Sequence, residues 1–549
     1  MKPFLIFTCL LIHFLNANGQ VYDAIYTTFQ TKCVSCHSNA THSGNLDLEG
    51  AGATIADKKV AVFNNLVNKV PSNAAAAAKN YKLIYPGRAD LSFLFHKINN
   101  GFEPTLALGA NEGASMPRSG TALTNTEKEF IRQWVLYGAN QNTTIPEGLV
   151  RAYYDTTGRA LEAFPQGAPA PPAASEGFQI KMGPFFLAPQ GRAGSELEYY
   201  QKHELLNLTQ MQEVNRLNFL FSTFSHHFII YNFTNNAGAS IPAGLRFDPN
   251  HSNIGVCAAV QEATDLKLPT KTAFKWEAGR ILDLNSHYIN YDATRVYKAE
   301  AYVNVYTQPV GTARQEMRSL LLANQNINIP ANNQTVTAES SLVLGAGQIY
   351  TWGVMGHTHK YGTGYKVFKR LANGTKGELL YDAACSGGVP GCAAPNFDYR
   401  HIPMRYYQPF LPITLNPGFI HQASWRNYGN TAVAFGPTSN DEMMVLIVMY
   451  LTDTTGLPTA TFDLPMIAQE VTVAPNPMLD KTTLTWHAVV SGRCRLRLFD
   501  LNGREMQAPQ SFLGGESIDI QRNTLAAGVY IYELEAESGQ RKQGKLVIQ

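Results

Sequence analysis

The sequence predicts a multidomain protein that is mostly β-sheet, with one small helical domain near its start. Its 549 residues can form several hydrophobic cores, and length alone suggests three or four domains. Charged residues make up only 16% of the chain while Tyr and Phe are plentiful, which favours β-rich secreted folds. Alternating strand patterns begin at Phe178 and continue to about Leu464. The formal net charge of +2 argues against a dedicated nucleic-acid binder.

Residues 1–19 have the pattern of a secretory signal peptide. Lys2 supplies the positive start, residues 4–15 the apolar centre and Ala17-Asn18-Gly19 a small-residue cleavage site. The apolar run is too short to span a bilayer comfortably, and no other segment is long and apolar enough. We therefore expect an exported protein with no membrane-spanning segment.

The next segment, residues 20–140, begins with a haem-attachment pattern. Cys33-Val34-Ser35-Cys36-His37 is C-x-x-C-H, in which two thiols can each add to a haem vinyl group while the next residue ligates the iron. A redox C-x-x-C or a disulfide is the alternative. Met116, before a proline, is the expected distal ligand, and methionine opposite histidine raises the iron potential. His96 is its rival, although a half-buried helix histidine is a simpler explanation.

A helix is expected at the end of this segment. Thr124 and Glu127 have the spacing of a capping box, and Gly138 provides a stop. Phe130, Ile131, Trp134 and Val135 lie on one face of it. Residues 20–140 thus resemble a single-haem cytochrome c domain. The resemblance implies a small all-α fold and one covalently bound haem c, with Cys33, Cys36, His37 and Met116 as the binding residues. Residues 141–176 are expected to be a linker, because Ala163–Pro172 is proline-rich and favours extended polyproline II.

Four later segments carry metal-ligand side chains. Side chains two apart on a strand share a face, so His357 and His359 are expected side by side. The segments are Ser225-His226-His227-Phe228, Asn285-Ser286-His287-Tyr288, Gly356-His357-Thr358-His359 and Asp441-Glu442-Met443. Imidazole suits copper and zinc equally, whereas the thioether of Met443 is a soft ligand that favours Cu(I).

Adjacent histidines on an ideal strand point to opposite faces. For His226 and His227 to share a metal, the chain needs a bulge or a strand end there, or the two rings must use different nitrogens. His401 and His421 also fall in the predicted sandwich region, and we expect each to be a hydrogen-bonded structural histidine.

The order His-His, lone His, His-x-His, Asp-Glu-Met resembles the type II, ascorbate-dependent copper monooxygenases. Peptidylglycine alpha-hydroxylating monooxygenase and dopamine beta-hydroxylase are familiar members. The resemblance covers roughly residues 177–453 and implies two jelly-roll-like β-sandwiches facing one another, here residues 177–330 and 331–464. It implies two copper ions, an electron-transfer copper and a catalytic copper that takes dioxygen. Their implied ligands are His226, His227 and His287 for the first and His357, His359 and Met443 for the second.

The resemblance implies hydroxylation of a C–H bond of an organic substrate with dioxygen, with ascorbate or an equivalent as external reductant. A peptide substrate is not carried over, because Met355 stands where the peptide-amidating enzyme has an arginine that grips the carboxylate. Val445 and Ile447 likewise replace its asparagine and tyrosine. The fused haem domain could serve as an internal electron donor or as the contact for a redox partner. The alternatives are a non-catalytic electron-transfer surface cytochrome with bound copper, and a copper oxidase that produces peroxide.

The cysteines outside the haem motif have separate expectations. Cys385 and Cys392 could close a short disulfide loop, which export favours. Cys494 lies on the apolar side of an alternating strand and is expected in a core. Cys257 has no assignment.

Residues 471–549 form a separate small unit. An Asn502-Gly503 hairpin turn lies between strand-like runs that end with Leu525–Tyr532 and Gly544–Ile548. The unit resembles the C-terminal sorting domain of the Bacteroidetes type IX secretion system, an Ig-like β-sandwich. The resemblance implies the type IX machinery as partner and release outside the cell or attachment to its surface. An ordinary accessory Ig-like domain is the alternative.

Overall fold

The computed structural model describes residues 20–206, 208–233, 237–247, 254–343, 345–385, 388–389, 397–400, 402–436, 440–458, 471–486, 493–500, 504–513, 517–536 and 541–549. The chain divides into two compact units, Met1–Phe462 and Asp463–Gln549. The predicted signal peptide, residues 1–19, lies outside the described residues. No helix in the described part of the chain is long and apolar enough to span a membrane.

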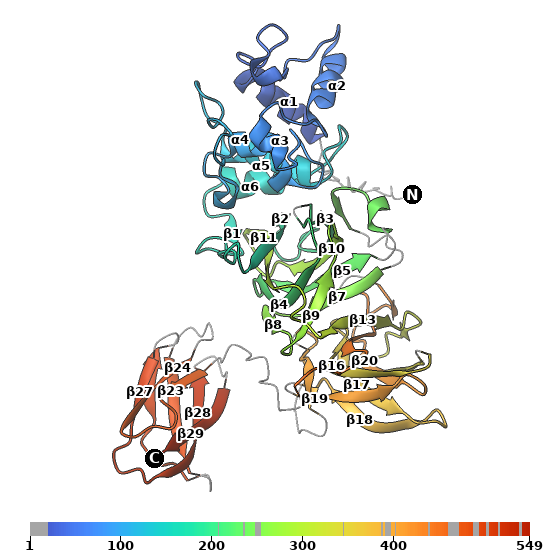
Figure 1. The fold of residues 1–549 in the computed structure, drawn as a ribbon, viewed down its shortest axis with the longest axis vertical. Coiled ribbons are helices and arrows are strands. Elements are labelled where there is room, and N and C mark those ends of the chain that lie inside the picture. Colours follow the sequence, from blue (N-terminus) through green and yellow to red (C-terminus); the bar gives the residue numbers. More distant parts are fainter. Residues whose placement is uncertain are drawn as a thin grey trace, which may run out of the picture. The chain divides into compact units, whose positions relative to one another are not determined.

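The first unit begins with a layer of helices (Figure 1). The α-helices are α1 (Val21–Lys32), α2 (Ile55–Leu66), α3 (Ala74–Ala78), α4 (Phe93–Asn99), α5 (Asn125–Leu136) and α6 (Glu147–Asp155), and short 3₁₀ turns are η1 (Ser43–Asn45), η2 (Ala89–Leu91) and η3 (Pro104–Leu106). The predicted capping box of α5 is confirmed, with Thr124 and Glu127 each bonding the other's backbone. Trp134 on α5 is fully buried, and Gly138 ends the helix with φ +99°.

A nine-stranded sheet runs through the rest of the first unit. In spatial order its strands are β19 (Arg405–Thr414), β16 (Gln348–His357), β22 (Val445–Leu451), β13 (Arg318–Ala323), β7 (Ile254–Val260), β5 (Ser225–Phe233), β10 (Ile281–Ile289), β3 (Glu196–Glu204) and β6 (Leu245–Arg246). β13 pairs with β22 on one side and β7 on the other, so backbone hydrogen bonds bridge the boundary expected near residue 330. The two β halves are therefore joined edge to edge through one sheet.

Two further sheets pack against this one to complete the β cores. The seven-stranded sheet contains β1 (Ala160–Glu162), β2 (Gly177–Leu187), β4 (Gln212–Phe221), β8 (Thr264–Lys267), β9 (Thr272–Trp276), β11 (Val296–Gln308) and β12 (Gln315–Glu316). The four-stranded sheet contains β15 (Thr335–Leu342), β17 (Gly362–Arg370), β18 (Lys376–Asp382) and β20 (Phe419–Arg426). Short pieces are β14 (Asn328–Ile329), β21 (Val433–Ala434) and η4 (Ala237–Ser240). Both cores form because the apolar faces of these strands are buried against one another.

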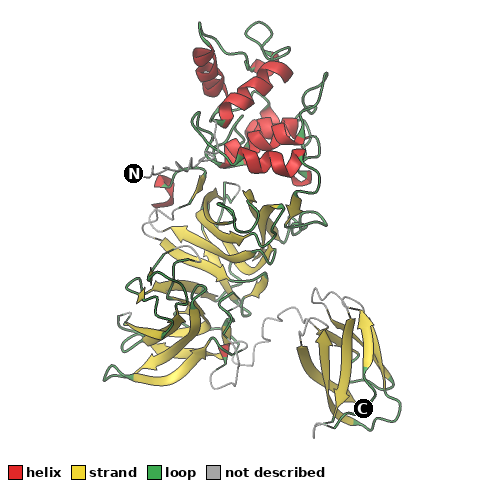
Figure 2. Cartoon of the chain, turned by 180° about the vertical axis from the view of Figure 1, so that it is seen from behind, coloured by secondary structure: helices red, strands yellow, loops and turns green. Residues whose placement is uncertain are grey.

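The segment expected to be a linker contains regular structure. Helix α6 and strand β1 both lie within residues 141–176, and β1 pairs in parallel with β11. The expectation of a semi-stiff connector therefore holds only for part of that range. Val150 and Tyr153 on α6 are buried in the core of the helical layer, together with Phe186 of β2. The helical layer and the first β half thus share apolar surface. Figure 2 shows the helices adjoining one end of the β region.

The second unit has two sheets around its own core. The three-stranded sheet contains β23 (Val471–Ala474), β24 (Lys481–Trp486) and β27 (Ser517–Gln521), and the four-stranded sheet contains β26 (Gln510–Leu513), β25 (Arg493–Phe499), β28 (Gly528–Ala536) and β29 (Arg541–Ile548). Cys494 is 1% exposed in this core, as expected, and it is a free cysteine. The predicted Asn502-Gly503 turn lies outside the described residues.

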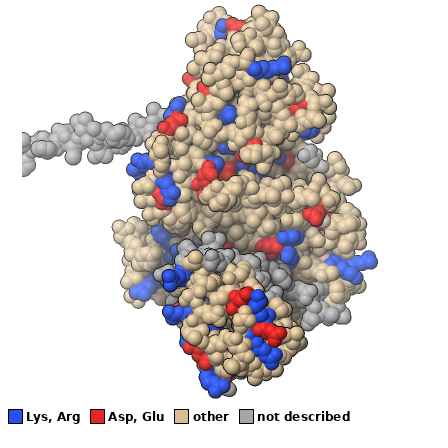
Figure 3. Space-filling model, turned by 90° about the vertical axis from the view of Figure 1, so that its left-hand side faces the viewer, with Lys and Arg blue, Asp and Glu red and all other residues tan. Residues whose placement is uncertain are grey.

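The surface carries charges of both signs. On the face drawn in Figure 3, basic and acidic side chains lie interspersed, with no large area of one sign. This distribution agrees with the small net charge.

Candidate functional site

Five histidines predicted as metal ligands come together in the first unit. We call them the histidine cluster: His226, His227, His287, His357 and His359. The first two lie on β5, the third on β10, His357 ends β16 and His359 follows two residues later. Ring centroids of neighbouring members are 5.1 to 6.5 Å apart. Residues more than 130 positions apart in the chain therefore meet within one small volume.

A β-bulge brings the adjacent pair of histidines to the same place. His227 lies opposite His287 across the β5–β10 ladder, while Ser225 lies opposite Tyr288, so the register shifts at His226. The extra residue turns the ring of His226 toward the cluster. A bulge here is one of the arrangements that would let the adjacent pair share a metal.

Each of three cluster histidines has one nitrogen bonded to the protein and one without a partner. The Nε2 atoms of His227 and His287 contact Asn285 Oδ1 at 3.1 Å and Glu196 Oε1 at 2.9 Å, while their Nδ1 atoms have no partner among the described residues. In His359 the roles are reversed, with Nδ1 at 3.2 Å from the backbone oxygen of Asp441. Metal-binding histidines typically show this division, in which one nitrogen is held and the other is left for the metal.

Three members of the cluster have a lowered pKa, which favours the neutral ring that binds a metal. Burial, followed by the neighbouring imidazoles, lowers the pKa of His226 and His357 well below the usual value of 6.5. The same burial lowers the pKa of His359 to about 4. His226 also has an unpartnered Nε2, in contrast to the Nδ1 of His227. The adjacent pair thus leaves different nitrogens free, as its geometry on one strand suggested.

Two glutamates of β3 support the cluster and were not anticipated. Glu196 contacts His287, and Glu198 lies 3.4 Å from His227 while accepting hydrogen bonds from Asn285 and Tyr200. Burial opposes ionisation of Glu198, but its hydrogen bond with His227 and nearby imidazoles lower its pKa to about 2. The Glu-x-Glu spacing places both side chains on one strand face, but this local signal does not indicate which strand they adjoin.

Glu442 organises the other side of the cluster. Its buried carboxylate accepts hydrogen bonds from the backbone N–H groups of His359 (2.8 Å), Tyr361 (2.6 Å) and Met443 (3.2 Å), and from Trp425 Nε1 (2.9 Å). Burial raises the pKa of Glu442 to about 7, although these four N–H donors act in the opposite direction. The Asp-Glu-Met motif therefore fixes the backbone on which His359 and Met443 both sit.

The donor types fit a copper site, but the side chains do not form a closed one as they stand. In the described part of the chain no three His, Cys, Asp or Glu side chains converge into a ready-made metal site. The neutral rings and their unpartnered nitrogens are nevertheless suitable ligands. Coordination would require the rings to turn about their side-chain torsions. Met443 is half-buried beside Glu442.

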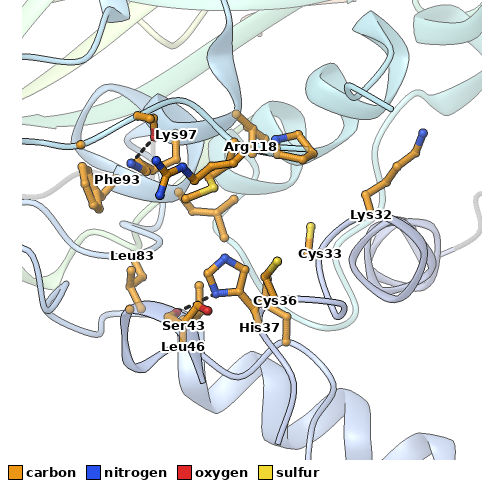
Figure 4. A pocket seen from close by; sticks show the side chains of 18 of the residues that line it. Lys32, Cys33, Cys36, His37, Ser43, Leu46, Leu83, Phe93, Lys97 and Arg118 are labelled. Atoms are coloured by element: carbon orange, nitrogen blue, oxygen red, sulfur yellow. Dashed lines mark hydrogen bonds between the residues drawn. The ribbon is translucent and has the colours of Figure 1, made fainter. Parts of the chain in front are cut away.

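A second group of predicted residues lines one cavity in the helical layer. The cavity has a volume of about 590 Å³, and Cys33, Cys36, His37 and Met116 all contribute to its wall. Both cysteines are unbridged, and His37 Nδ1 lies 2.8 Å from the backbone oxygen of Ser43. This contact leaves Nε2 of His37 available to a ligand (Figure 4). The four residues and the space between them fit a covalently attached haem.

The rival ligand His96 has a different environment. It is 4% exposed on α4 and does not line the cavity. Its Nε2 lies 2.8 Å from the backbone oxygen of Asp90, and its ring stacks on Tyr81 with centroids 4.8 Å apart. These contacts describe a packed, hydrogen-bonded histidine outside the cavity, whereas Met116 lines it.

Cys257, Cys385 and His421 also lie in the described part of the first unit. Cys257 is buried and its Sγ accepts a hydrogen bond from Trp276 Nε1 at 3.3 Å. Cys385 is disulfide-bonded, while Cys392 lies outside the described residues, as does His401. His421 is fully buried with its Nδ1 2.5 Å from the hydroxyl of Tyr365, which confirms its expected structural role.

His421 leads to a prediction about acid stability. Burial lowers its pKa from 6.5 to about 4, so between these values the unfolded chain binds a proton that the folded chain does not. Stability should therefore fall as the pH drops below 6.5, by up to about 1.4 kcal/mol per pH unit for this one group. Urea unfolding of the wild type and His421→Gln at about pH 7 and pH 5 measures this change in the free energy of unfolding. We expect the wild type to lose up to about 2 kcal/mol more than the variant. Equal losses would contradict the assignment.

Among the comparisons with known proteins, the match to a protein family covers only the tail of the chain. Residues 472–549 match the family described as the secretion system C-terminal sorting domain. No curated protein matches the chain.

Similarity to solved structures is weak. A β-1,2-glucanase from Parabacteroides distasonis is 10% identical to this chain, with a TM-score of 0.14. The match covers 43% of this chain and 33% of the glucanase. The protein STIV MCP is also 10% identical, with a TM-score of 0.21. The match covers 54% of this chain and 94% of STIV MCP. The chain thus spans about a third of the glucanase's length. The tail identifies this protein as one that the type IX secretion system exports to the cell surface or the extracellular space.

Proposed function

We propose that this protein is an exported copper-dependent monooxygenase that hydroxylates a C–H bond of an organic substrate with dioxygen, and that its helical domain carries a covalent haem c. The observation that carries the proposal is the histidine cluster. Five ligands expected from three separate motifs meet at 5.1 to 6.5 Å, although the sequence analysis used only their order and spacing.

The pattern of protein contacts around the cluster supports a metal role over a purely structural one. Buried polar groups without partners are costly. His96, His203 and His421 each leave one buried ring nitrogen unpartnered as well, so the gathering of several such nitrogens in one place is what distinguishes the cluster. Here four cluster nitrogens are buried and unpartnered: His226 Nε2, His227 Nδ1, His287 Nδ1 and His359 Nε2. The two proposed copper ions would compensate them. Copper is favoured over zinc because Met443 completes the expected ligand set.

The roles of the chain's own residues follow from their contacts. Copper bound here would supply one-electron chemistry and activation of dioxygen. Asn285 and Glu196 would orient the rings of His227 and His287, and Gln261, which contacts His357 Nδ1, would do the same for that ring. Glu442 would hold the loop that carries His359 and Met443 in register. Burial of the cluster would exclude water from the reaction.

Metal and haem content of the purified mature protein is the first test. We expect two coppers and one haem per chain by elemental analysis and visible spectroscopy. One haem and no copper, even after incubation with copper salts, would contradict the enzyme and leave an exported electron-transfer cytochrome. Incorporation of labelled dioxygen into a product separates a monooxygenase from an oxidase that releases peroxide.

A further inference from the structure

Two basic side chains meet at the wall of the haem-sized cavity without an acidic partner between them. Lys97 lies on α4, and Arg118 follows Met116 by two residues; both line the cavity. Figure 4 shows the guanidinium of Arg118 beside the ammonium of Lys97. The ammonium donates to the backbone oxygens of Glu112 (3.1 Å) and Ala114. Arg118 makes no hydrogen bond or ion pair with any residue that the structure describes.

Other basic side chains in the helical layer are paired with carboxylates. The nearby carboxylate of Glu112 bonds Lys79 at 2.6 Å, and buried Arg132 is paired with Glu103 and Glu129. Lys97 and Arg118 form no such ion pair within the described residues. Glu112 also lines the cavity, and its charge raises the pKa of Lys97, whereas burial and then the charge of Arg118 lower it. Like charges held side by side are unfavourable unless an anion lies between or beside them.

The cavity indicates which anion belongs there. Its floor carries Cys33, Cys36 and His37, and the basic pair lies across the space from them (Figure 4). A haem is an apolar ring with two propionate carboxylates on its edge, and thioether bonds to the cysteines would fix its orientation. Arginine suits such a carboxylate because its planar fork can donate two parallel hydrogen bonds.

We infer that Lys97 and Arg118 form an anion subsite that holds the propionate carboxylates of the haem attached at Cys33 and Cys36. The inference rests on the proposed haem and adds the residues that orient it and tune it. A fixed positive charge near the haem favours the reduced state, because reduction adds negative charge. The pair is therefore expected to raise the midpoint potential and to keep the propionates ionised.

The test is a spectroelectrochemical titration of the full haem-loaded protein and three variants. Arg118→Gln and Lys97→Gln each remove one charge of the pair, while Lys32→Gln removes an equal charge that lines the same cavity beside Cys33. We expect each of the first two to lower the reduction equilibrium constant about threefold to tenfold, where tenfold is about 59 mV for one electron. Lys32→Gln should change it less than about twofold.

The outcomes are distinguishable. A haem spectrum in the wild type with equal shifts in all three variants, or with none, would overturn the subsite and leave the haem in place. Absence of haem from the wild type would overturn the haem and the subsite together. Two independent variants keep the result interpretable if one of them does not fold.

Discussion

Glu442→Ala is expected to destabilise the β region of the first unit by more than about 4 kcal/mol and to abolish metal binding at the His359 side of the cluster. The carboxylate is fully buried and accepts four N–H bonds, from His359, Tyr361, Met443 and Trp425. Alanine would leave all four donors buried without partners, at about 1 to 3 kcal/mol each. The loop carrying two of the six proposed ligands would lose its anchor.

The measurement is urea unfolding of the copper-free protein, followed by copper titration of the folded fraction. Glu442→Gln is the graded variant, because its one carbonyl oxygen can keep the bonds from His359, Met443 and Trp425 but presents an amide to Tyr361. Glu339→Ala is the control, since that exposed carboxylate pairs only with surface groups such as Lys376 and should cost less than about 1 kcal/mol. A similar cost for Glu442→Ala and Glu339→Ala would refute the anchoring role.

Sequence reasoning identified the histidines of the cluster more readily than the residues that contact and orient them. His226, His227 and His357 could be proposed as ligands because adjacent or alternating histidines on strands are distinctive. The bulge at His226 could be anticipated for the same reason. Glu198 could not be assigned, because its role depends on β3 pairing with β10, a long-range register that no local pattern fixes.

The connections between domains were harder to predict than the domains. Proline-rich sequence before β2 suggested a free linker, but α6 and β1 dock because their apolar residues complete the core around Phe186. The continuous sheet through β13 was also not visible, since a six-residue strand says nothing about which neighbours it joins. Tertiary burial decided both cases.

Polar contacts join the helical layer to the first β half. Arg88 donates to the backbone oxygen of Glu204 at 2.7 Å, Gln201 donates to that of Gly87 at 3.0 Å, and Lys181 pairs with Glu103 at 2.6 Å. Glu204 ends the same strand, β3, whose Glu198 supports the cluster, and six residues of strand span about 20 Å. These contacts show that the helical layer is docked on the first β half, and they argue against a free tether between the two.

His359→Ala is expected to lower dioxygen consumption by more than about 100-fold while leaving the haem spectrum and its reduction unchanged. His359 is fully buried, its Nδ1 is held by Asp441 and its Nε2 is unpartnered, so the ring is positioned for ligation. Loss of a ligand should exceed the 10- to 100-fold typical of losing a supporting residue. The haem cavity shares no residue with the cluster, so the haem should be unaffected.

The assay follows dioxygen uptake with ascorbate on copper-loaded protein, together with bound copper per chain. His421→Gln is the matched control, a buried histidine of the same β half whose Nδ1 already contacts Tyr365. It should retain both coppers and near-normal uptake, whereas His359→Ala should lose one copper. Uptake that is equal in the wild type and His359→Ala would place the oxygen chemistry elsewhere. A wild type that binds copper but consumes no dioxygen would instead favour a metal-carrying surface protein, because the ligands would then be present without the reaction.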